Sequence, residues 1–257
     1  LFLVDGLNAN IPFQHSLDHK TQDSLIVGDK SVFIKTYGRT ATPNITINQI
    51  VGTHPSIPDL PFEYIKQQGS LPGFSAYIDY RENFASIENL KANSLDGILL
   101  GKNMIFNVGS GDPRFMEFRG NIQIRDIDLK QLMSPKVRDK IDDGKIKADL
   151  NLSIRDLSEP VANMDLFFSI FQIGSDFGKS ALNVISSQNF LMDRIADSYS
   201  VKVIDVSLSK GLVYADVYFR RSILSLFVNL EDSKISQQRM PLANFLKRAR
   251  SEIESYQ

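Results

Sequence analysis

The residues best suited to metal binding are two histidines near the start of the chain. His15 and His19 stand four positions apart, with Asp18 and Asp23 close by. This spacing would place two imidazoles on one face of a helix for a zinc ion. Residues 14–22, however, are polar and lack the apolar periodicity of a helix, and a histidine ligand also needs an ordered partner for its second ring nitrogen. We therefore expect a solvated loop here and no metal site.

The sequence lacks the common motifs that mark a catalytic site. The chain contains no cysteine, which excludes a thiol nucleophile and a thiolate metal site, and no Gly-x-Ser-x-Gly turn presents a serine. The Gly-Ser-Gly of residues 109–111 is not followed by a helix with a lysine, so a hairpin turn is favoured over a phosphate loop. Asp142-Asp143 and Glu231-Asp232 fall at turns, which indicates solvated charges. We expect no catalytic residue, no cofactor and no enzyme activity.

The composition is that of a globular chain without a nucleic-acid partner. Lys and Arg number 29 against 30 Asp and Glu, for a formal net charge of −1, so there is no basic excess to neutralise phosphates. With 42% hydrophobic residues over 257 positions, the chain can bury a large core. It opens inside a strand-like run without an initiator Met. We expect a single β-rich domain over residues 1–257 that is a fragment of a longer protein.

Most of the chain alternates apolar and polar residues with a period of two, which predicts strands with one buried face. The clearest case is residues 145–157, where Ile146, Leu150, Leu152 and Ile154 are expected on the interior face. Ser209-Lys210-Gly211 predicts a hairpin turn. The other predicted strands are 31–37, 44–51, 74–80, 97–108, 115–127, 161–173, 199–208, 212–219 and 223–230.

Helices are expected in three places. Residues 129–141 predict a short helix broken near Pro135, and residues 186–197 predict a linker helix. A C-terminal amphipathic helix is expected over residues 241–256, with Pro241 as its first residue. Its apolar stripe would face the protein, and its cations would face solvent. The stripe is Leu242, Phe245, Leu246, Ala249 and Ile253, and the cations are Lys247, Arg248 and Arg250.

The alternation does not show what covers the apolar faces of the strands. Two sheets can bury these faces against each other in a sandwich, or one curved sheet can leave its apolar face open to a ligand. Periodicity is the same in both cases, and the residues taken alone favour the sandwich.

The order of these pieces resembles the C-terminal portion of AsmA-like proteins, the bacterial envelope family that includes TamB-type bridge proteins. The resemblance lies in β-pattern and glycine placement, and it covers the chain from about Leu95 to the end. Four segments carry the resemblance. Residues 95–99, Leu-Asp-Gly-Ile-Leu, lead into a long strand, and residues 118–129 contain a glycine within a strand that ends in Asp-Leu. Residues 143–150 place a glycine before an alternating strand, and residues 209–214 place a glycine turn before a late strand.

The resemblance implies a mainly β fold, a long curved antiparallel sheet that forms an apolar trough like a partly open barrel, with a few short helices. It also implies a periplasmic protein, tethered to the inner membrane through a segment missing from this chain, that moves phospholipids toward the outer membrane. Its expected partners are phospholipid acyl chains and a protein of the outer or inner membrane. Lys247, Arg248 and Arg250 are candidates for contact with head groups or a partner. The groove-lining candidates are Ile98, Leu100, Met104, Phe106, Ile122, Ile124, Ile146, Leu150, Leu152, Ile154, Leu166 and Phe168.

Two other functions remain open at this point. The chain could be a structural or adhesion-type β-sandwich with a dry core. It could also be a β-rich carbohydrate-active enzyme, although the absence of tryptophan removes the strongest sugar-stacking side chain.

Overall fold

The computed structural model describes residues 2–5, 8–10, 44–53, 59–81, 84–87, 89–107, 112–185, 199–221 and 234–254. Its short helical elements are η1 Pro113–Phe115, η2 Leu129–Leu132, α1 Pro135–Arg138, α2 Ser175–Ile185 and α4 Leu242–Glu254. A small sheet contains β1 Phe2–Asp5, β4 Gln49–Thr53 and β5 Pro61–Ile65. The strands of the large sheet are β2 Asn8–Asn10, β3 Asn44–Ile47, β6 Phe74–Arg81, β7 Phe84–Ile87, β8 Leu90–Ser94, β9 Gly97–Asn107, β10 Glu117–Asp128, β11 Lys145–Ile154, β12 Met164–Gln172, β13 Tyr199–Ser209, β14 Leu212–Arg221 and β15 Lys234–Pro241.

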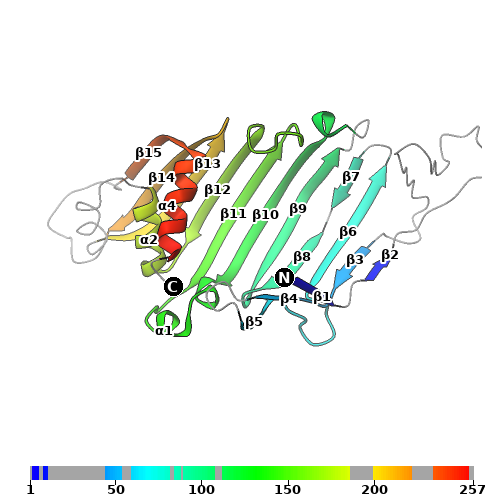
Figure 1. Cartoon of the computed structure of the whole chain (residues 1–257), viewed down its shortest axis with the longest axis horizontal. Coiled ribbons are helices and arrows are strands. Elements are labelled where there is room, and N and C mark those ends of the chain that lie inside the picture. The colour runs from blue at the N-terminus through cyan, green and yellow to red at the C-terminus, as the bar shows by residue number, and fades with distance from the viewer. Residues whose placement is uncertain are drawn as a thin grey trace, which may run out of the picture.

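The large sheet is antiparallel throughout and open. Its order is β15-β14-β13-β12-β11-β10-β9-β7-β6-β3-β2, with β8 pairing both β6 and β9. From β9 to β15 each described strand lies beside the next one in the chain, as Figure 1 shows. β15 and β2 form the two edges of the described sheet. The fold is therefore mainly β, a curved antiparallel sheet with few helices, as the resemblance implied. The sandwich that the residues alone favoured is wrong, because twelve of the described strands belong to one sheet.

Two-residue turns set the register of two hairpins. Lys210 and Gly211 have φ of 51° and 72° and join the paired residues Ser209 and Leu212, which is the mirror-image turn that matches strand twist. The predicted hairpin is therefore confirmed. Leu95 and Asp96, with φ of 49° and 57°, join β8 to β9 in the same way. A leucine in this conformation is strained, and its carbonyl oxygen accepts a hydrogen bond from the Asp128 backbone N–H at 2.8 Å.

Several predicted elements differ from the structure. Residues 44–51 form two strands in different sheets, because the chain bends at Asn48 between β3 and β4. Phe115 belongs to η1 rather than to the following strand. Helix α2 and strand β15 were not predicted. The predicted strands 31–37 and 223–230, and the predicted helix 186–197, lie outside the described residues.

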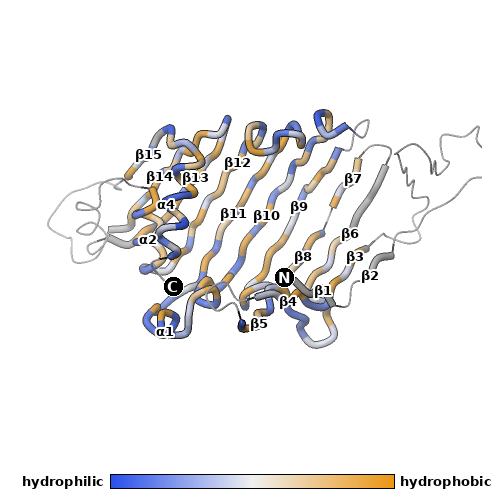
Figure 2. The backbone as a smooth tube through the Cα atoms, viewed as in Figure 1, coloured by the Kyte–Doolittle hydropathy of each residue, from blue (hydrophilic) through white to orange (hydrophobic). Residues whose placement is uncertain are grey.

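Hydropathy alternates along the long central strands, as the tube in Figure 2 shows for β9 to β12. The pairing registers align the apolar residues of neighbouring strands, so that Ile122, Leu150, Phe168 and Val206 form one row across β10 to β13. Side chains that are directly paired lie on the same face of a sheet. One face of the large sheet is therefore apolar, and the opposite face, called the polar face below, carries the charged and polar side chains together with some apolar ones, such as Ile105, Phe167 and Phe171.

Helices α2 and α4 cover the apolar face at the C-terminal end of the sheet, in front of β13 to β15 in Figure 1. Leu182 and Ile185 of α2 are buried with Ile204 of β13 and with Phe219 of β14. Phe245 of α4 packs against the same cluster and against a second one around Leu208, Val213 and Met240. This covered end holds the largest cluster of buried side chains among the described residues.

The C-terminal helix begins one residue later than predicted. Pro241 is the last residue of β15 and pairs with Leu212, and α4 starts at Leu242. A proline can end an edge strand because its nitrogen has no hydrogen to donate to the sheet. The inward placement of Leu246 is also wrong, since 56% of its surface is exposed.

Candidate functional site, an open apolar face

The predicted alternation in β11 is confirmed by its pairing on both sides. Ile122, Leu150 and Phe168 are directly paired across β10, β11 and β12, and Leu152 pairs with Leu166. Ile146 is 7% exposed and lies across from Ile127. The polar residues of the same strand face the other way, and Arg125 Nη2 binds Asp149 Oδ1 there at 2.9 Å.

A bulge in β9 corrects two of the predicted groove residues. Arg119 pairs with Ile105 and Asn121 pairs with Lys102, so β9 holds one extra residue at this point. The extra residue is Asn103, whose φ is 51°. In β9, the odd-numbered residues before the bulge lie on the apolar face, and the even-numbered residues after the bulge lie on that same face. Ile98 and Leu100 therefore lie on the polar face, and Leu99 takes their place, directly paired with Ile124.

Met104 and Phe106, which follow the bulge, lie on the apolar face as predicted. Phe106 pairs with Phe118, and Met104 is 7% exposed. Met104 fits there because two neighbouring positions are glycine. A Cβ on Gly101 would lie 2.6 Å from Met104 Sδ, and a Cβ on Gly120 would lie 3.1 Å from its Cγ. A Cβ on Gly101 would force the methionine sulfur to shift, and a Cβ on Gly120 would require the methionine Cγ to move by a few tenths of an ångström.

We call the part of this face over β9 to β12 the open apolar face. Helices α2 and α4 lie over β13 to β15, and η2 contacts β11 at the start of that strand, where the Leu129 N–H donates to the Gly144 carbonyl. The side chains of the open apolar face are buried or half-buried, whereas Ile105, Phe167 and Phe171 on the polar face are 44%, 44% and 42% exposed. The open apolar face consists of Leu99, Met104, Phe106, Phe118, Ile122, Ile124, Ile146, Leu150, Leu152, Ile154, Leu166 and Phe168.

The polar face carries a row of hydrogen-bonded side chains that cross the strands. Ser169 Oγ donates to Asp205 Oδ1 at 2.6 Å, and Ser209 Oγ donates to Asp165 Oδ1 at 2.6 Å. Asn121 Nδ2 donates to Asn151 Oδ1 at 2.9 Å. These groups remain partly solvated and also bind one another, so the polar face is suited to contact with water. The sheet as a whole is therefore amphipathic.

One carboxylate of this face links the edge strand β15 to β14. Asp216 Oδ1 accepts a hydrogen bond from Ser236 Oγ at 2.6 Å, and Asp216 Oδ2 lies 3.0 Å from Lys234 Nζ. The Ser236 hydroxyl, and then the Lys234 ammonium, hold the pKa of Asp216 below its ordinary value. The ionised carboxylate is thus the form that the folded state favours.

These contacts of Asp216 predict that the stability of the sheet edge formed by β14 and β15 depends on pH. Because the folded pKa of Asp216 is depressed, its contribution to stability is present above the unfolded value of about 3.9 and is lost as the pH falls through the folded pKa. Asp216→Asn should lower the urea midpoint at pH 7, and the difference from wild type should shrink as the pH falls below 4. Ser236→Ala should raise the pKa of Asp216, measured by carboxyl NMR. An Asp216 titration unchanged by Ser236→Ala would contradict this account.

The three basic candidates of α4 do not form one exposed cluster. Lys247 and Arg250 are exposed, and Arg250 Nε donates to Glu254 Oε1 at 2.8 Å, which raises the pKa of Arg250. Arg248 is half-buried, and its Nη1 atom is buried without a hydrogen-bond partner among the described residues. The prediction that all three face solvent is therefore wrong for Arg248, because it shares the inner side of the helix with Phe245 and Ala249.

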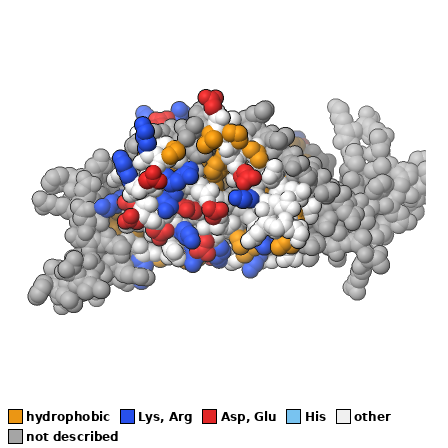
Figure 3. Space-filling view, turned by 90° about the horizontal axis from the view of Figure 1, so that it is seen from below, with side chains coloured by type: hydrophobic (Ala, Val, Ile, Leu, Met, Phe, Trp, Pro, Cys, Tyr) orange, Lys and Arg blue, Asp and Glu red, His pale blue; other side chains and the backbone are white. Residues whose placement is uncertain are grey.

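No metal-binding arrangement is found in the described part of the chain. There, no three His, Asp or Glu side chains are placed to hold a metal ion, and His15 and His19 lie outside the described residues. Asp142 and Asp143 are exposed in the turn before β11, as predicted, and Asp143 accepts the Lys145 N–H at 2.9 Å. Around this end of the molecule, Figure 3 shows acidic and basic side chains intermingled.

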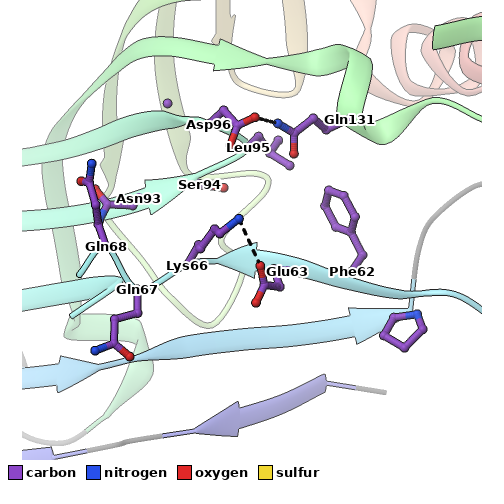
Figure 4. Close-up of a pocket in the computed structure, with 12 residues that line it drawn as sticks. Phe62, Glu63, Lys66, Gln67, Gln68, Asn93, Ser94, Leu95, Asp96 and Gln131 are labelled. Carbon is purple, nitrogen blue, oxygen red and sulfur yellow. Dashed lines mark hydrogen bonds and ion pairs between the residues drawn. The ribbon is translucent and has the colours of Figure 1, made fainter. Parts of the chain in front are cut away.

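A polar pocket of about 490 Å³ lies between β5 and the turn that joins β8 to β9. Figure 4 shows Lys66 and Glu63, both from the β5 side of the pocket, reaching toward each other, with Asp96 and Gln131 bonded to each other above them. Nζ of Lys66 lies 3.6 Å from Oε2 of Glu63. Sequence reasoning missed this pocket, because β5 and β8 are far from η2 in the chain and no motif links them.

Comparisons with family models, curated proteins and solved structures found no match for this chain. None of the described helices has the length and apolar character that crossing a membrane requires. The open apolar face and the polar pocket are therefore the features of the described residues that bear on function.

Proposed function

We propose that this chain is a non-enzymatic phospholipid-binding and transfer segment of a periplasmic protein that is anchored in the inner membrane and supports lipid transport to the outer membrane. The open apolar face binds acyl chains, and head groups stay in water at its margin. No bond is made or broken in this function. The proposal extends the resemblance of the sequence to AsmA-like proteins.

The observation that carries the proposal is the difference between the two faces of one sheet. A contiguous apolar sheet face that no second layer covers marks a binding surface, even where its side chains are half-buried. Here α2 and α4 cover only the C-terminal part of that face, and β9 to β12 keep a continuous apolar row beyond them. Each buried CH₂ contributes about 0.8 kcal/mol, so an acyl chain laid along several strands would be held firmly without a single polar contact.

An adhesion-type module with a dry core is the principal competing function. It requires a second apolar surface over β9 to β12, and none of the described strands or helices supplies one. A carbohydrate-active enzyme has less support, because Glu63 and Asp96 in the polar pocket are bonded to Lys66 and Gln131.

Lipid extraction from the purified protein tests the proposal. The chain would be directed to the periplasm of a bacterium with two membranes, purified without detergent, and its extracted lipids quantified by mass spectrometry. We expect phospholipid in near-stoichiometric amount, and we expect delipidated protein to take up phospholipid again from vesicles. Lipid-free protein that takes up no phospholipid from vesicles would contradict the proposal and favour the dry module.

A further inference from the structure

The two ends of the open apolar face are built differently. Where β10 ends and β11 begins, Met133, Ile141 and Phe177 form a buried cluster that joins η2, the segment after α1, and α2. Figure 1 shows α1 at the lower ends of these strands. The opposite end carries η1 and the connection between β11 and β12, residues 155–163. An acyl chain would therefore leave the face more easily at the η1 end than at the end that the cluster covers.

The η1 end exposes two large apolar side chains. Phe115 is 62% exposed and Val161 is 53% exposed. They belong to adjoining loops, because the Leu157 N–H donates to the Pro113 carbonyl at 3.0 Å. Arg114 lies over the Phe115 ring, with its Cζ 5.9 Å from the ring centroid. A single exposed apolar side chain is ordinary, but two on joined loops beside an apolar face suit contact with an apolar partner.

These two loops continue the open apolar face. β10 begins two residues after Phe115, and its Phe118 pairs with Phe106 on that face. On the next strands, Ile154 pairs with Met164 at the base of the β11–β12 connection. Side chains of directly paired residues lie on the same face of a sheet. The apolar surface therefore runs from the strands to the base of both loops that expose Phe115 and Val161.

The charges around these loops are not arranged to attract an anion. The two segments, 112–119 and 155–165, contain three arginines, and each has a carboxylate oxygen at 3.5 Å or less. The pairs are Arg114 with Asp112, Arg119 with Glu117, and Arg155 with Asp165. Asp156 and Glu159 add two further carboxylates. Since the segments have no excess of positive charge, a zwitterionic lipid surface fits them better than an anionic one.

We propose that η1 and the β11–β12 connection dock on a zwitterionic phospholipid surface, with Phe115 and Val161 entering its interfacial layer. This inference rests on the proposed function, because it assigns the place where a phospholipid enters or leaves the open apolar face. Apolar side chains gain free energy from burial among lipids. The neighbouring arginines are already paired, so the contact needs no complementary charge from a protein partner.

The test is cosedimentation of the chain with phosphatidylcholine vesicles. Phe115→Ser should weaken binding about fivefold or more, and Val161→Ser about threefold, because each removes an apolar side chain from the lipid contact. Leu71→Ser is the matched control. Leu71 is 57% exposed in the connection between β5 and β6, at the other end of the sheet, and this variant should bind as wild type does. All three variants should keep the wild-type urea midpoint, since the side chains are exposed.

The composition of the vesicles tests the chemistry of the surface. Replacing part of the phosphatidylcholine with phosphatidylglycerol should not tighten binding, and binding to phosphatidylcholine should be similar at low and at high salt. Binding that requires phosphatidylglycerol, or that high salt abolishes, would overturn the proposal. A loss with Leu71→Ser as large as the loss with Phe115→Ser would also overturn it, because the contact would then not be specific to the η1 end.

A short-chain lipid separates this proposal from the lipid-binding function. Dihexanoylphosphatidylcholine, used below the concentration at which it forms micelles, reaches the open apolar face without a bilayer and should bind wild type and Phe115→Ser equally. If it binds wild type but vesicles do not, the docking surface is wrong and the lipid-binding face stands. If it does not bind wild type at all, the proposed function fails, and the docking surface fails with it.

Discussion

Leu182→Ala should lower the free energy of unfolding by about 2–5 kcal/mol, the range for removing a fully buried leucine side chain. Leu182 is 1% exposed and lies between α2 and the sheet, in the cluster that contains Ile204, Val217 and Phe219. The cavity cannot fill easily, because strands β13 and β14 are fixed by ten residue pairs and by the turn at Lys210 and Gly211. Urea unfolding followed by circular dichroism measures the loss.

Leu246→Ala is the matched control for this core. Leu246 belongs to α4, the helix that packs beside α2, but 56% of its surface is exposed. The same change of side chain should therefore alter the free energy of unfolding by less than about 0.5 kcal/mol. Equal losses in the two variants would mean that α2 is not seated on the sheet as described, and the assignment of the covered end would have to be abandoned.

The β content of this chain could be predicted because alternation is a local property. In β11, each residue's face follows from its parity, and the pairing on both sides agrees with the sequence. The turn at Lys210 and Gly211 was predictable for the same reason, since a glycine between two alternating runs is a local signal. Such features need no knowledge of the rest of the fold.

The bulge at Asn103 shows where that reasoning ends. One extra residue in β9 reverses which residues, odd-numbered or even-numbered, lie on the apolar face. Ile98 and Leu100 therefore lie on the polar face, although Met104 and Phe106 lie on the apolar one. The sequence of β9 offers an apolar residue at both parities, Leu99 and Leu100, so hydropathy could not choose between them. The choice is made by Gly101 and Gly120, which accept the Met104 side chain on the apolar face. That contact joins two strands and is not visible in either one alone.

Other missed features also depend on distant partners. Strand β15, with the sequence Lys-Ile-Ser-Gln-Gln-Arg-Met-Pro, is too polar to be predicted as a strand, and it is held by pairing with β14 and by the Asp216 contacts. The burial of Arg248 and the exposure of Leu246 follow from how α4 docks against α2, where Asn183 Nδ2 donates to Glu252 Oε1 at 3.2 Å. An apolar stripe predicts that a helix docks through one face, but it does not determine how the helix is rotated about its own axis.

Leu150→Glu should reduce bound phospholipid about tenfold or more, which corresponds to about 1.4 kcal/mol of lost binding free energy. Leu150 lies in the middle of the open apolar face, between Ile122 and Phe168, so a carboxylate there would have to lose its water beneath an acyl chain. The fold should survive, because the side chain is only half-buried before lipid binds. Lipid mass spectrometry and a urea melt on the same sample measure the two effects separately.

Leu100→Glu makes the same chemical change on the other face and is the matched control. Leu100 is also half-buried, but it pairs with Gln123 on the polar face, where a carboxylate can remain in water. This variant should carry as much phospholipid as wild type. Equal loss of lipid from both variants would mean that binding does not distinguish the two faces, and the open apolar face would no longer be the lipid site. If Leu150→Glu instead unfolded the chain while Leu100→Glu did not, the face over β9 to β12 would be a closed core, as in the dry adhesion module.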